Sequence, residues 1–456
     1  MTDFSRLVDP RFGLVTALLR REHGPELPSA LISFTASVAD SRFLGPWQGD
    51  RVALGCAFWD ETQARRAAIG EAVERTCGNF IPRGLQRATF RQLAARGEAA
   101  LDPRDLPLYS ESQYRARGFP FVRFTPDLPI LWAQGEDLAD GSRVLLPASL
   151  VYINYFAGAL AAEPKTHFVA YAGIATGPSR TEAERAALEE LIERDATMIW
   201  WHAGAPSRRI DIAGSARLSA ALESPGDASG LDYRLIEIAN PLGVPVLGAL
   251  LLDRKNDLAV LGSACRTDPL GAALKALAEA IHLRAFSLQM LDPNGSVWGS
   301  MRAGILDARA YKPFRADRRY LDHYRPDWRD VTDLGAQAQV WLDPRLHPAL
   351  EPLLEAAGPF PLAGVPALAG EDRRAALLER LAAHGLRAYS AEVTTPDVAS
   401  CGLSVVRVIV PGLVPNAPAA FPYLGCPRLY TEPARLGWSD RPLEEDELVR
   451  TPLPHA

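Results

Sequence analysis

Lysine is scarce in this chain of 456 residues, and no lysine follows a glycine. The absence of a Gly-Lys pair excludes a Walker A loop, and the chain also lacks a G-x-S-x-G elbow and an H-E-x-x-H helix. Nearly every cation is an arginine, so a phosphate site has to use arginine forks, backbone N–H groups or metal ions. The net charge of −6 gives no electrostatic footprint for nucleic acid, and no such partner is expected.

Cysteines and long apolar runs are few as well. The five cysteines include no Cys-x-x-Cys pair, which favours a reducing cytoplasm and argues against a structural zinc site. The longest apolar stretch, around residues 244–252, is far short of the ~20 residues that span a bilayer. Residues 1–6 contain no apolar signal core. We therefore expect a cytoplasmic protein with no membrane partner.

Apolar periodicity and capping residues predict the main elements. Residues 1–58 contain short apolar runs typical of strands, and residues 433–456 form a proline-containing tail. Residues 84–150 are rich in proline and are expected to be irregular. With no linker rich in Gly or Ser, the simplest interpretation is one intertwined α/β unit over residues 1–456. Long helices are predicted at 60–77, 179–202, 268–292 and 371–384, and later strands at 233–238, 245–252, 258–264, 386–393 and 403–410.

A near-repeat of acidic residues is the most informative feature. Residues 68–75 and 187–194 each contain Glu-x-x-Glu-Arg inside an otherwise apolar helix. The acids of the first helix lie about 60° apart on one face, and those of the second fall within about 80°. The carboxylates on these two faces are Glu71, Glu74, Glu182, Glu190 and Glu193.

Five carboxylates on two faces repel one another unless cations lie between them. An all-oxygen set suits a hard ion such as Mg²⁺, and Arg75 and Arg194 would then reach phosphate oxygens. The alternative is a solvated helix face with ordinary i,i+3 and i,i+4 ion pairs. Apolar neighbours and the repetition favour the metal site. Glu182 also has a competing role in a capping box with Ser179, although a Thr181 cap would leave it free.

At these residues the chain resembles the YcaO family, ATP-using enzymes that modify peptide backbones. The likeness rests on residues 64–77, on residues 173–195 with their E-(x)7-E-x-x-E-R spacing, and on residues 394–412, with Pro427-Arg-Leu-Tyr430 beyond. Segments at 108–114, 147–152 and 339–345, and the Pro-x-Pro ending, are similar to the cyclodehydratase branch. That branch makes thiazoline and oxazoline rings in ribosomally made peptides.

The resemblance implies a mixed α+β fold within the α/β class, in which one large domain has mixed and antiparallel sheets and long helices around an ATP cleft. ATP and Mg²⁺ are the implied cofactors, and the five glutamates are the implied metal ligands. Arg75, Arg194, Glu279 and Arg284 are expected to bind the nucleotide. One departure is Gly55-Cys56-Ala57, where the family often has a Gly-Lys-Gly turn, so a lysine contact to phosphate is missing.

The resemblance also gives the C-terminus a catalytic role. The α-carboxylate of Ala456 would act as an acid/base, held by the stiff Pro452-x-Pro454 segment. A disordered terminus is the alternative.

The implied reaction is ATP-dependent cyclodehydration. A Cys thiol, or a Ser or Thr hydroxyl, attacks the preceding backbone carbonyl of a precursor peptide, ATP phosphorylates the oxyanion, and loss of phosphate leaves the azoline. Fewer than about sixty residues precede the first motif, too few for a fused leader-binding domain, so a separate E1-like, leader-peptide-binding partner is expected. A flavin-dependent azoline dehydrogenase and a homodimer are further expectations. Thioamide or amidine formation, or a non-catalytic scaffold or regulator, are the alternatives.

Overall fold

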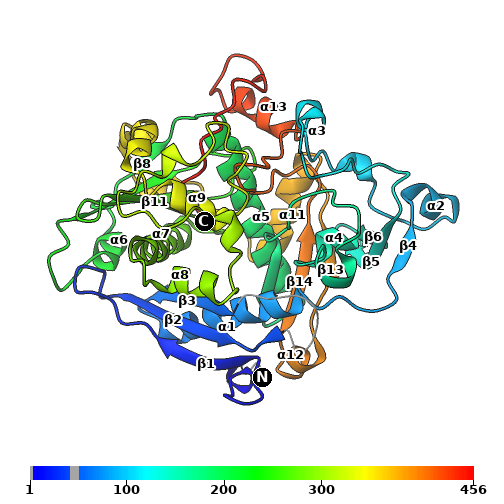
Figure 1. Ribbon diagram of the computed structural model, residues 1–456, viewed down its shortest axis with the longest axis horizontal. Coiled ribbons are helices and arrows are strands. Elements are labelled where there is room, and N and C mark those ends of the chain that lie inside the picture. Colours follow the sequence, from blue (N-terminus) through cyan, green and yellow to red (C-terminus); the bar gives the residue numbers. More distant parts are fainter. Residues whose placement is uncertain (1–3, 42–50, 456) are drawn as a thin grey trace.

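The computed structural model describes residues 4–41 and 51–455, and it contains three β-sheets around three long helices (Figure 1). The N-terminal sheet is antiparallel with the order β1-β2-β3, and it lies at the bottom of Figure 1 in blue. Its strands occupy the predicted segment: β1 (Val15–Arg20), β2 (Leu31–Val38) and β3 (Val52–Phe58).

The other two sheets confirm the expected mixture of antiparallel and mixed pairing. One has the order β4-β5-β13-β14-β7, with β6 added to β5, and every pair is antiparallel. The other has the order β11-β10-β9-β8-β12, in which only β12 and β8 are parallel. Their bounds are β4 (Gln86–Ala88), β5 (Ile130–Asp137), β6 (Arg143–Pro147), β7 (Ile174–Gly177), β8 (Arg208–Ile210), β9 (Leu231–Glu237), β10 (Val246–Asp253), β11 (Leu258–Cys265), β12 (Ala357–Phe360), β13 (Tyr389–Glu392) and β14 (Ser404–Ile409).

Three long helices begin where their capping residues predict. The helices are α1 (Glu61–Cys77), α5 (Arg180–His202) and α7 (Pro269–Leu291). The side chains of Asp60, Ser179 and Asp268 accept hydrogen bonds from the first turns. Ser179 therefore caps α5, and the prediction that Thr181 could cap this helix instead is wrong. The shorter helices are α2 (Phe90–Ala95), α3 (Glu111–Arg115), α4 (Ala148–Val151), α6 (Ala216–Ala221), α8 (Ser296–Arg302), α9 (Leu334–Val340), α10 (Glu351–Leu354), α11 (Arg373–Ala383), α12 (Pro396–Ser400) and α13 (Arg428–Arg435).

Residues 84–150 are more regular than their proline content predicts. They contain β4, α2, α3 and a hairpin of β5 and β6, and Trp132 in this hairpin is almost fully buried. Gly141, which follows Asp140 in the hairpin turn, has a φ of +74°, a conformation that glycine adopts without strain. The sequence signal for this hairpin is the Asp140-Gly141 pair between two apolar runs. Most of the prolines in residues 84–150 lie between the elements and do not interrupt them.

The three long helices join the three sheets at their open edges. β3, β7 and β11 are the edge strands of their respective sheets. Helix α1 contacts β3 and β7, α5 contacts β7 and β11, and α7 contacts β11 and β3. Two glycines allow this close approach, because a Cβ at Gly55 would lie 2.0 Å from Ala68 N of α1, and a Cβ at Gly262 would lie 2.4 Å from Ala276 O of α7.

The C-terminal tail runs through the interior. Helix α13 continues past Pro433 to Arg435, so the tail begins after the helix rather than at residue 433. Trp201 Nε1 donates to Thr451 O at 2.7 Å, and Trp341 Nε1 donates to Pro452 O at 2.9 Å. These bonds, together with the buried side chains of residues 452–454, fix the tail beside α5. Whether residues 1–456 act as a single domain stays a prediction.

None of the helices in residues 4–41 and 51–455 is long and apolar enough to cross a membrane.

Candidate active site

On α1, two predicted acids accept hydrogen bonds from the open edges of two different sheets. Glu71 Oε2 accepts from Leu54 N of β3 at 3.0 Å. Glu74 Oε1 accepts from Thr176 N of β7 at 2.7 Å. An edge strand leaves such N–H groups without a ladder partner, so each glutamate satisfies a donor that the sheet cannot.

On α5, the two acids of the second motif make the same kind of contact. Glu190 Oε2 accepts from Gly173 N, just before β7, at 2.9 Å. Glu193 Oε2 accepts from Cys265 N of β11 at 3.2 Å, and its Oε1 accepts from Ser263 Oγ at 2.8 Å. All three sheets therefore meet at four carboxylates, and Gly173 and Thr176 bring Glu190 next to Glu74 along one short segment.

Burial and mutual proximity raise the pKa values of acids in this cluster. Burial, together with the neighbouring carboxylates of Glu190 and Glu71, raises the pKa of Glu74 to about 8. Burial also raises the pKa of Glu71 and of Glu193. A cluster that resists ionisation in this way stabilises a cation placed between its members.

Both arginines of the repeated motif lie in this cluster. Arg75 Nη2 is 3.7 Å from Glu71 Oε1, and its guanidinium lies over the ring of Tyr171. Arg194 lies 3.0 Å from Glu193 and 3.8 Å from Glu190. The second guanidinium thus lies between two of the acids, and both motif arginines pair with carboxylates of the cluster.

Helix α7 supplies a further charged pair from the third side. Glu279 forms an ion pair with Lys275, one turn earlier. Although burial acts in the opposite direction, the Lys275 ammonium lowers the pKa of Glu279 to about 2. Lys275 also interacts electrostatically with Cys56 on β3, the position where the expected lysine is missing. The sequence analysis missed Lys275, although its i,i+4 spacing to Glu279 on an apolar helix was a usable signal.

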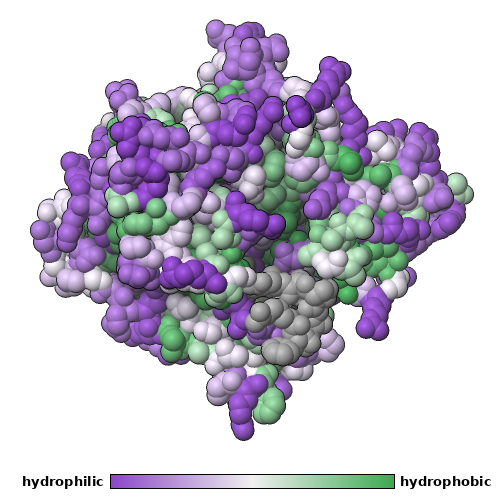
Figure 2. All heavy atoms as spheres, viewed as in Figure 1, coloured by the Kyte–Doolittle hydropathy of each residue, from purple (hydrophilic) through white to green (hydrophobic). Residues whose placement is uncertain are grey.

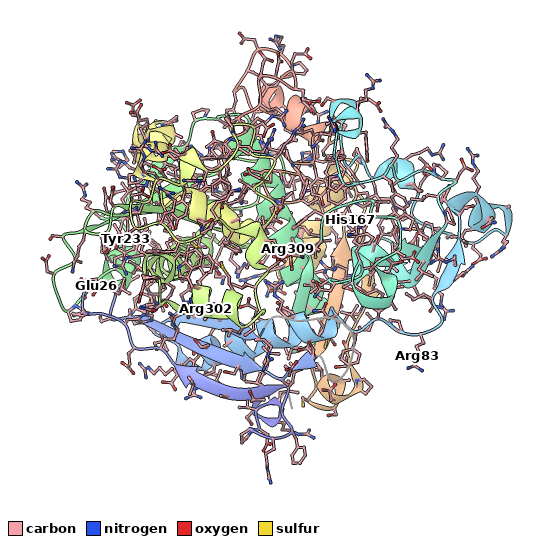
Figure 3. The ribbon with its side chains drawn as sticks, in the orientation of Figure 1. Glu26, Arg83, His167, Tyr233, Arg302 and Arg309 are labelled. Atoms are coloured by element: carbon pink, nitrogen blue, oxygen red, sulfur yellow. The ribbon has the colours of Figure 1, made fainter. Side chains whose placement is uncertain are left out.

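Two predicted residues have partners elsewhere. The Glu182 side chain is 49% exposed and pairs with Arg185 at 3.0 Å on the first turns of α5. Arg284 Nε donates to Asp253 at 2.7 Å, and its Nη2 lies 3.5 Å from Glu26. Figure 3 shows Glu26 at the left margin of the molecule, away from α5. The structure therefore brings neither side chain into the acid cluster.

The C-terminal residue predicted to be catalytic, Ala456, lies outside the described residues. Its neighbour His455 is described: its Nε2 lies 3.4 Å from Arg194 Nη1, and its carbonyl accepts from Gln337 Nε2 at 3.2 Å. The last described residue of the tail thus reaches the cluster.

The cluster is open to a ligand. The side chains of Glu71, Glu190 and Glu279 are each between 32% and 36% exposed, although all three lie deep among the elements. The face drawn in Figure 2 is hollowed near its centre, beside α5. This access separates the cluster from the buried pair of Asp195 and Arg428, which joins α13 to α5.

The donor set fits Mg²⁺ held together with phosphate. Among residues 4–41 and 51–455, no three acidic, histidine or cysteine side chains are arranged to hold one metal ion by themselves. Mg²⁺ commonly binds one or two carboxylates and completes its octahedral shell with water and substrate phosphates. Four carboxylates and two arginines from α1 and α5, with the lysine of α7 nearby, are suited to a metal–nucleotide complex rather than to a bare ion.

Comparison with known proteins gives the class to which this fold and site belong. A sequence model described as an ATP- and Mg²⁺-binding YcaO cyclodehydratase matches residues 59–414. The chain therefore belongs to the YcaO family. It is similar to an uncharacterized protein encoded in the tfuA 3′ region of Rhizobium leguminosarum bv. trifolii, with 27% identity over 288 residues. That match covers 60% of this chain and 61% of the relative, so the chain spans about three fifths of the length of that relative.

Solved structures share the fold. A heterocyclase in complex with substrate and cofactor matches with a TM-score of 0.70 and 22% identity, covering 100% of this chain and 57% of the other. YcaO from Methanopyrus kandleri, bound with AMPPCP and Mg²⁺, matches with a TM-score of 0.56 and 20% identity over 88% of this chain and 86% of the other. At these identities the likeness establishes the fold, and the YcaO-type architecture expected from the sequence is confirmed.

Proposed function

We propose that this protein is an ATP-dependent cyclodehydratase that forms thiazoline or oxazoline rings from Cys, Ser or Thr of a ribosomally made precursor peptide. The observation that carries the proposal is the convergence of Glu71, Glu74, Glu190 and Glu193 on the open edges of three sheets. Membership of a family described as ATP- and Mg²⁺-binding supports the same conclusion.

In this proposal, the acidic residues bind the metal ion and the basic residues bind phosphate. The four glutamates would hold Mg²⁺, and the metal together with ATP would supply an activated phosphoryl group for the amide oxygen. Arg75 and Arg194 bind the phosphate oxygens, on which negative charge accumulates in the transition state. Lys275 would add a third cation, held in place by its ion pair with Glu279.

Three further residues, Ala456, Glu182 and Arg284, are proposed as site residues with less structural support than the four glutamates. The α-carboxylate of Ala456 is the candidate acid/base, since His455 reaches Arg194 and holds the tail beside the cluster. Glu182 and Arg284 would need to leave their partners, Arg185 and Asp253, before they could bind metal or nucleotide. The proposal therefore depends on neither of them.

The substrate and the partners follow from the proposed reaction. A heterocyclase that shares this fold was solved in complex with substrate and cofactor, which supports a bound substrate and cofactor for this chain. We propose that a separate E1-like protein binds the leader peptide for this chain, and that a flavin-dependent dehydrogenase oxidises the azoline afterwards. A homodimer is the proposed assembly, and the cytoplasm the proposed compartment.

The first experiment tests the nucleotide site. Mg²⁺-ATP is expected to raise the melting temperature, because a ligand at about 100 times its Kd adds ~2.7 kcal/mol to the stability of the folded state. EDTA is expected to abolish the increase. An increase that survives EDTA would show that the carboxylates are not metal ligands.

The second experiment tests the product. Candidate Cys-rich precursors are co-expressed with this chain and its E1-like partner, and mass spectrometry is expected to find one water lost per azoline. Exchange of oxygen for sulfur would instead assign thioamide formation. An amidine formed with an amine of the same peptide also loses one water, so fragmentation has to show whether the water was lost at a Cys, Ser or Thr residue or at an amine. An unmodified precursor in the presence of all partners would support a scaffold role.

A further inference from the structure

A chain of two hydrogen bonds links α7 to the loop that follows β1. His282 Nε2 lies 3.1 Å from Ser33 Oγ, and the same hydroxyl lies 3.0 Å from His23 Nε2. Ser33 is completely buried on β2, whereas His23 is half-buried. The side chains of α7, β2 and the loop after β1 therefore form one continuous polar path.

The inner end of this path lies beside the candidate active site. Ser33 and Cys56 are direct cross-strand partners, so both side chains point from the sheet toward the same side. Lys275 and Glu279 lie against Cys56 on that side, and His282 follows Glu279 by one helical turn. The path thus starts next to the Lys275–Glu279 pair and ends near the molecular surface.

The nitrogen atoms at the two ends are accessible. Within the described part of the chain, Nδ1 of His282 and Nδ1 of His23 make no hydrogen bond. Neither atom is completely buried. Both atoms therefore keep contact with solvent-accessible space, one on the α7 side and one on the outer side. A proton can enter at one end and leave at the other.

Burial favours the neutral form of both imidazoles, and Arg21 acts in the same direction on each. Burial lowers the pKa of His282 to about 4, with Lys275 and Arg21 acting in the same direction and Glu279 opposing them. Burial and Arg21 also lower the pKa of His23. A neutral imidazole has one donor and one acceptor nitrogen, and a hydroxyl both donates and accepts. The three groups can therefore be oriented in a single direction.

We propose that His282, Ser33 and His23 form a proton relay between the reaction site and solvent. This inference rests on the proposed function, in which formation of the ring's C–S or C–O bond breaks an S–H or O–H bond. The released proton binds His282 Nδ1, and the proton on His282 Nε2 moves to Ser33 Oγ. The hydroxyl proton moves to His23 Nε2, and His23 Nδ1 releases its proton to water. Tautomer exchange and rotation of the hydroxyl restore the starting state.

Removal of the hydroxyl tests the relay. Ser33→Ala is expected to slow phosphate release from Mg²⁺-ATP in the presence of the precursor by about 10²-fold, the lower range for loss of a proton-transfer group. Added imidazole is expected to restore much of the rate, since a small buffer can carry the proton instead. Ser33→Thr keeps the hydroxyl and is expected to retain activity. Ser37→Ala, on the same face of β2, is the matched control.

A second variant protects the test from a folding defect. His23→Gln at the half-buried outer end keeps a hydrogen-bonding side chain but cannot pass a proton, and it is expected to show the same loss and the same rescue. A Ser33→Ala rate equal to that of the wild type would overturn the relay. A loss without rescue, accompanied by a lower melting temperature, would show that the bonds only fasten β2 to α7. If the wild type releases no phosphate, the proposed function itself fails.

Discussion

Glu74 is the residue at which the electrostatics of the site are most informative. Its pKa is raised to about 8 by burial and by Glu190 and Glu71, so the free protein carries this side chain mostly as the neutral acid near pH 7. A neutral carboxyl group donates a proton that a metal ion has to displace. The free site and the metal-bound site therefore differ by at least one proton.

A conservative change at Glu74 separates folding from metal binding. Gln resembles the protonated acid, so Glu74→Gln is expected to change the stability of the free protein by less than ~0.5 kcal/mol. The same variant is expected to lose most of the Mg²⁺-ATP stabilisation and about 10² or more in phosphate release. Melting curves with and without Mg²⁺-ATP measure the first effect, and a phosphate assay measures the second.

The matched control is Glu182→Gln, which removes an exposed carboxylate from α5. Because this carboxylate pairs with Arg185, the variant is expected to bind Mg²⁺-ATP like the wild type. Equal losses in both variants would place Glu182 among the metal ligands and contradict the separation that the structure indicates.

The raised pKa of Glu74 also predicts opposite pH dependences for the stability of the free protein and for the extra stability that Mg²⁺ and nucleotide add to it. The folded protein holds a proton that the unfolded chain releases near its ordinary pKa of 4.5, so stability contributed by this group is lost as the pH rises toward about 8. Binding of Mg²⁺ requires the ionised form and is expected to strengthen up to about tenfold per pH unit below that pKa. Melting temperatures from about pH 6 to about pH 8, with and without Mg²⁺ and AMPPCP, test both slopes. A ligand-induced increase in melting temperature that stays constant or shrinks from about pH 6 to about pH 8 would be inconsistent with a Glu74 ligand.

At the scale of elements, the site depends on how closely three helices approach three edge strands. α1, α5 and α7 each contact two of β3, β7 and β11, so a shift of one helix displaces acids from two edges. The backbone approach between α1 and β3 is allowed by Gly55, whose missing Cβ would collide with Ala68 N and Ala64 O. Packing at this point is therefore a condition for the geometry of Glu71.

Two glycine substitutions, one on β3 against α1 and one on α1 facing β7, are expected to act in opposite directions. Gly55→Ala forces α1 away from β3, so we expect a loss of stability of about 3 kcal/mol or more and loss of Mg²⁺-ATP binding. Gly70→Ala, inside α1, meets only Thr176 Cβ at 4.0 Å and is expected to add up to ~1 kcal/mol through helix propensity. Denaturant unfolding of both variants measures the difference. A stable Gly55→Ala protein would disprove the tight approach.

At the scale of the whole molecule, the C-terminal tail connects the acid cluster to the core. Leu261 N donates to Pro454 O at 2.7 Å, so the tail hydrogen-bonds to a strand of the third sheet. Leu453 is 7% exposed and packs into the same hydrophobic core as α5. The tail thus contributes to the fold and to the site together.

Changes in the tail are therefore expected to affect stability and ligand binding together. Leu453→Ala keeps the backbone contacts and is expected to cost ~2–3 kcal/mol through the cavity it leaves. Deletion of residues 452–456 also removes the partners of Trp341 and Leu261, and we expect a larger loss together with weaker stabilisation by Mg²⁺-ATP. Thermal melting of both variants provides the comparison. A deletion variant that melts and binds like the wild type would show that the tail is dispensable.

Much of this protein was determined locally by its sequence. The caps at Asp60, Ser179 and Asp268 and the apolar periodicity placed α1, α5 and α7 within a few residues, because a helix depends on neighbours three and four positions away. The same periodicity put the acids of each motif on one helix face. The family resemblance supplied what local rules could not, namely the link between these acids and ATP.

Only the tertiary structure decided which of the glutamates lie in one cluster, because that depends on contacts between segments distant in the sequence. It gathered Glu71, Glu74, Glu190 and Glu193 at three sheet edges and kept Glu182 apart, although Glu182 shares the helix face of Glu190 and Glu193. It also brought Lys275 beside Cys56, and His282 to Ser33 across 249 positions of the sequence. The helical period fixes the angle of a side chain around the helix axis. The neighbouring strand edge determines whether that side chain forms a hydrogen bond across to another element.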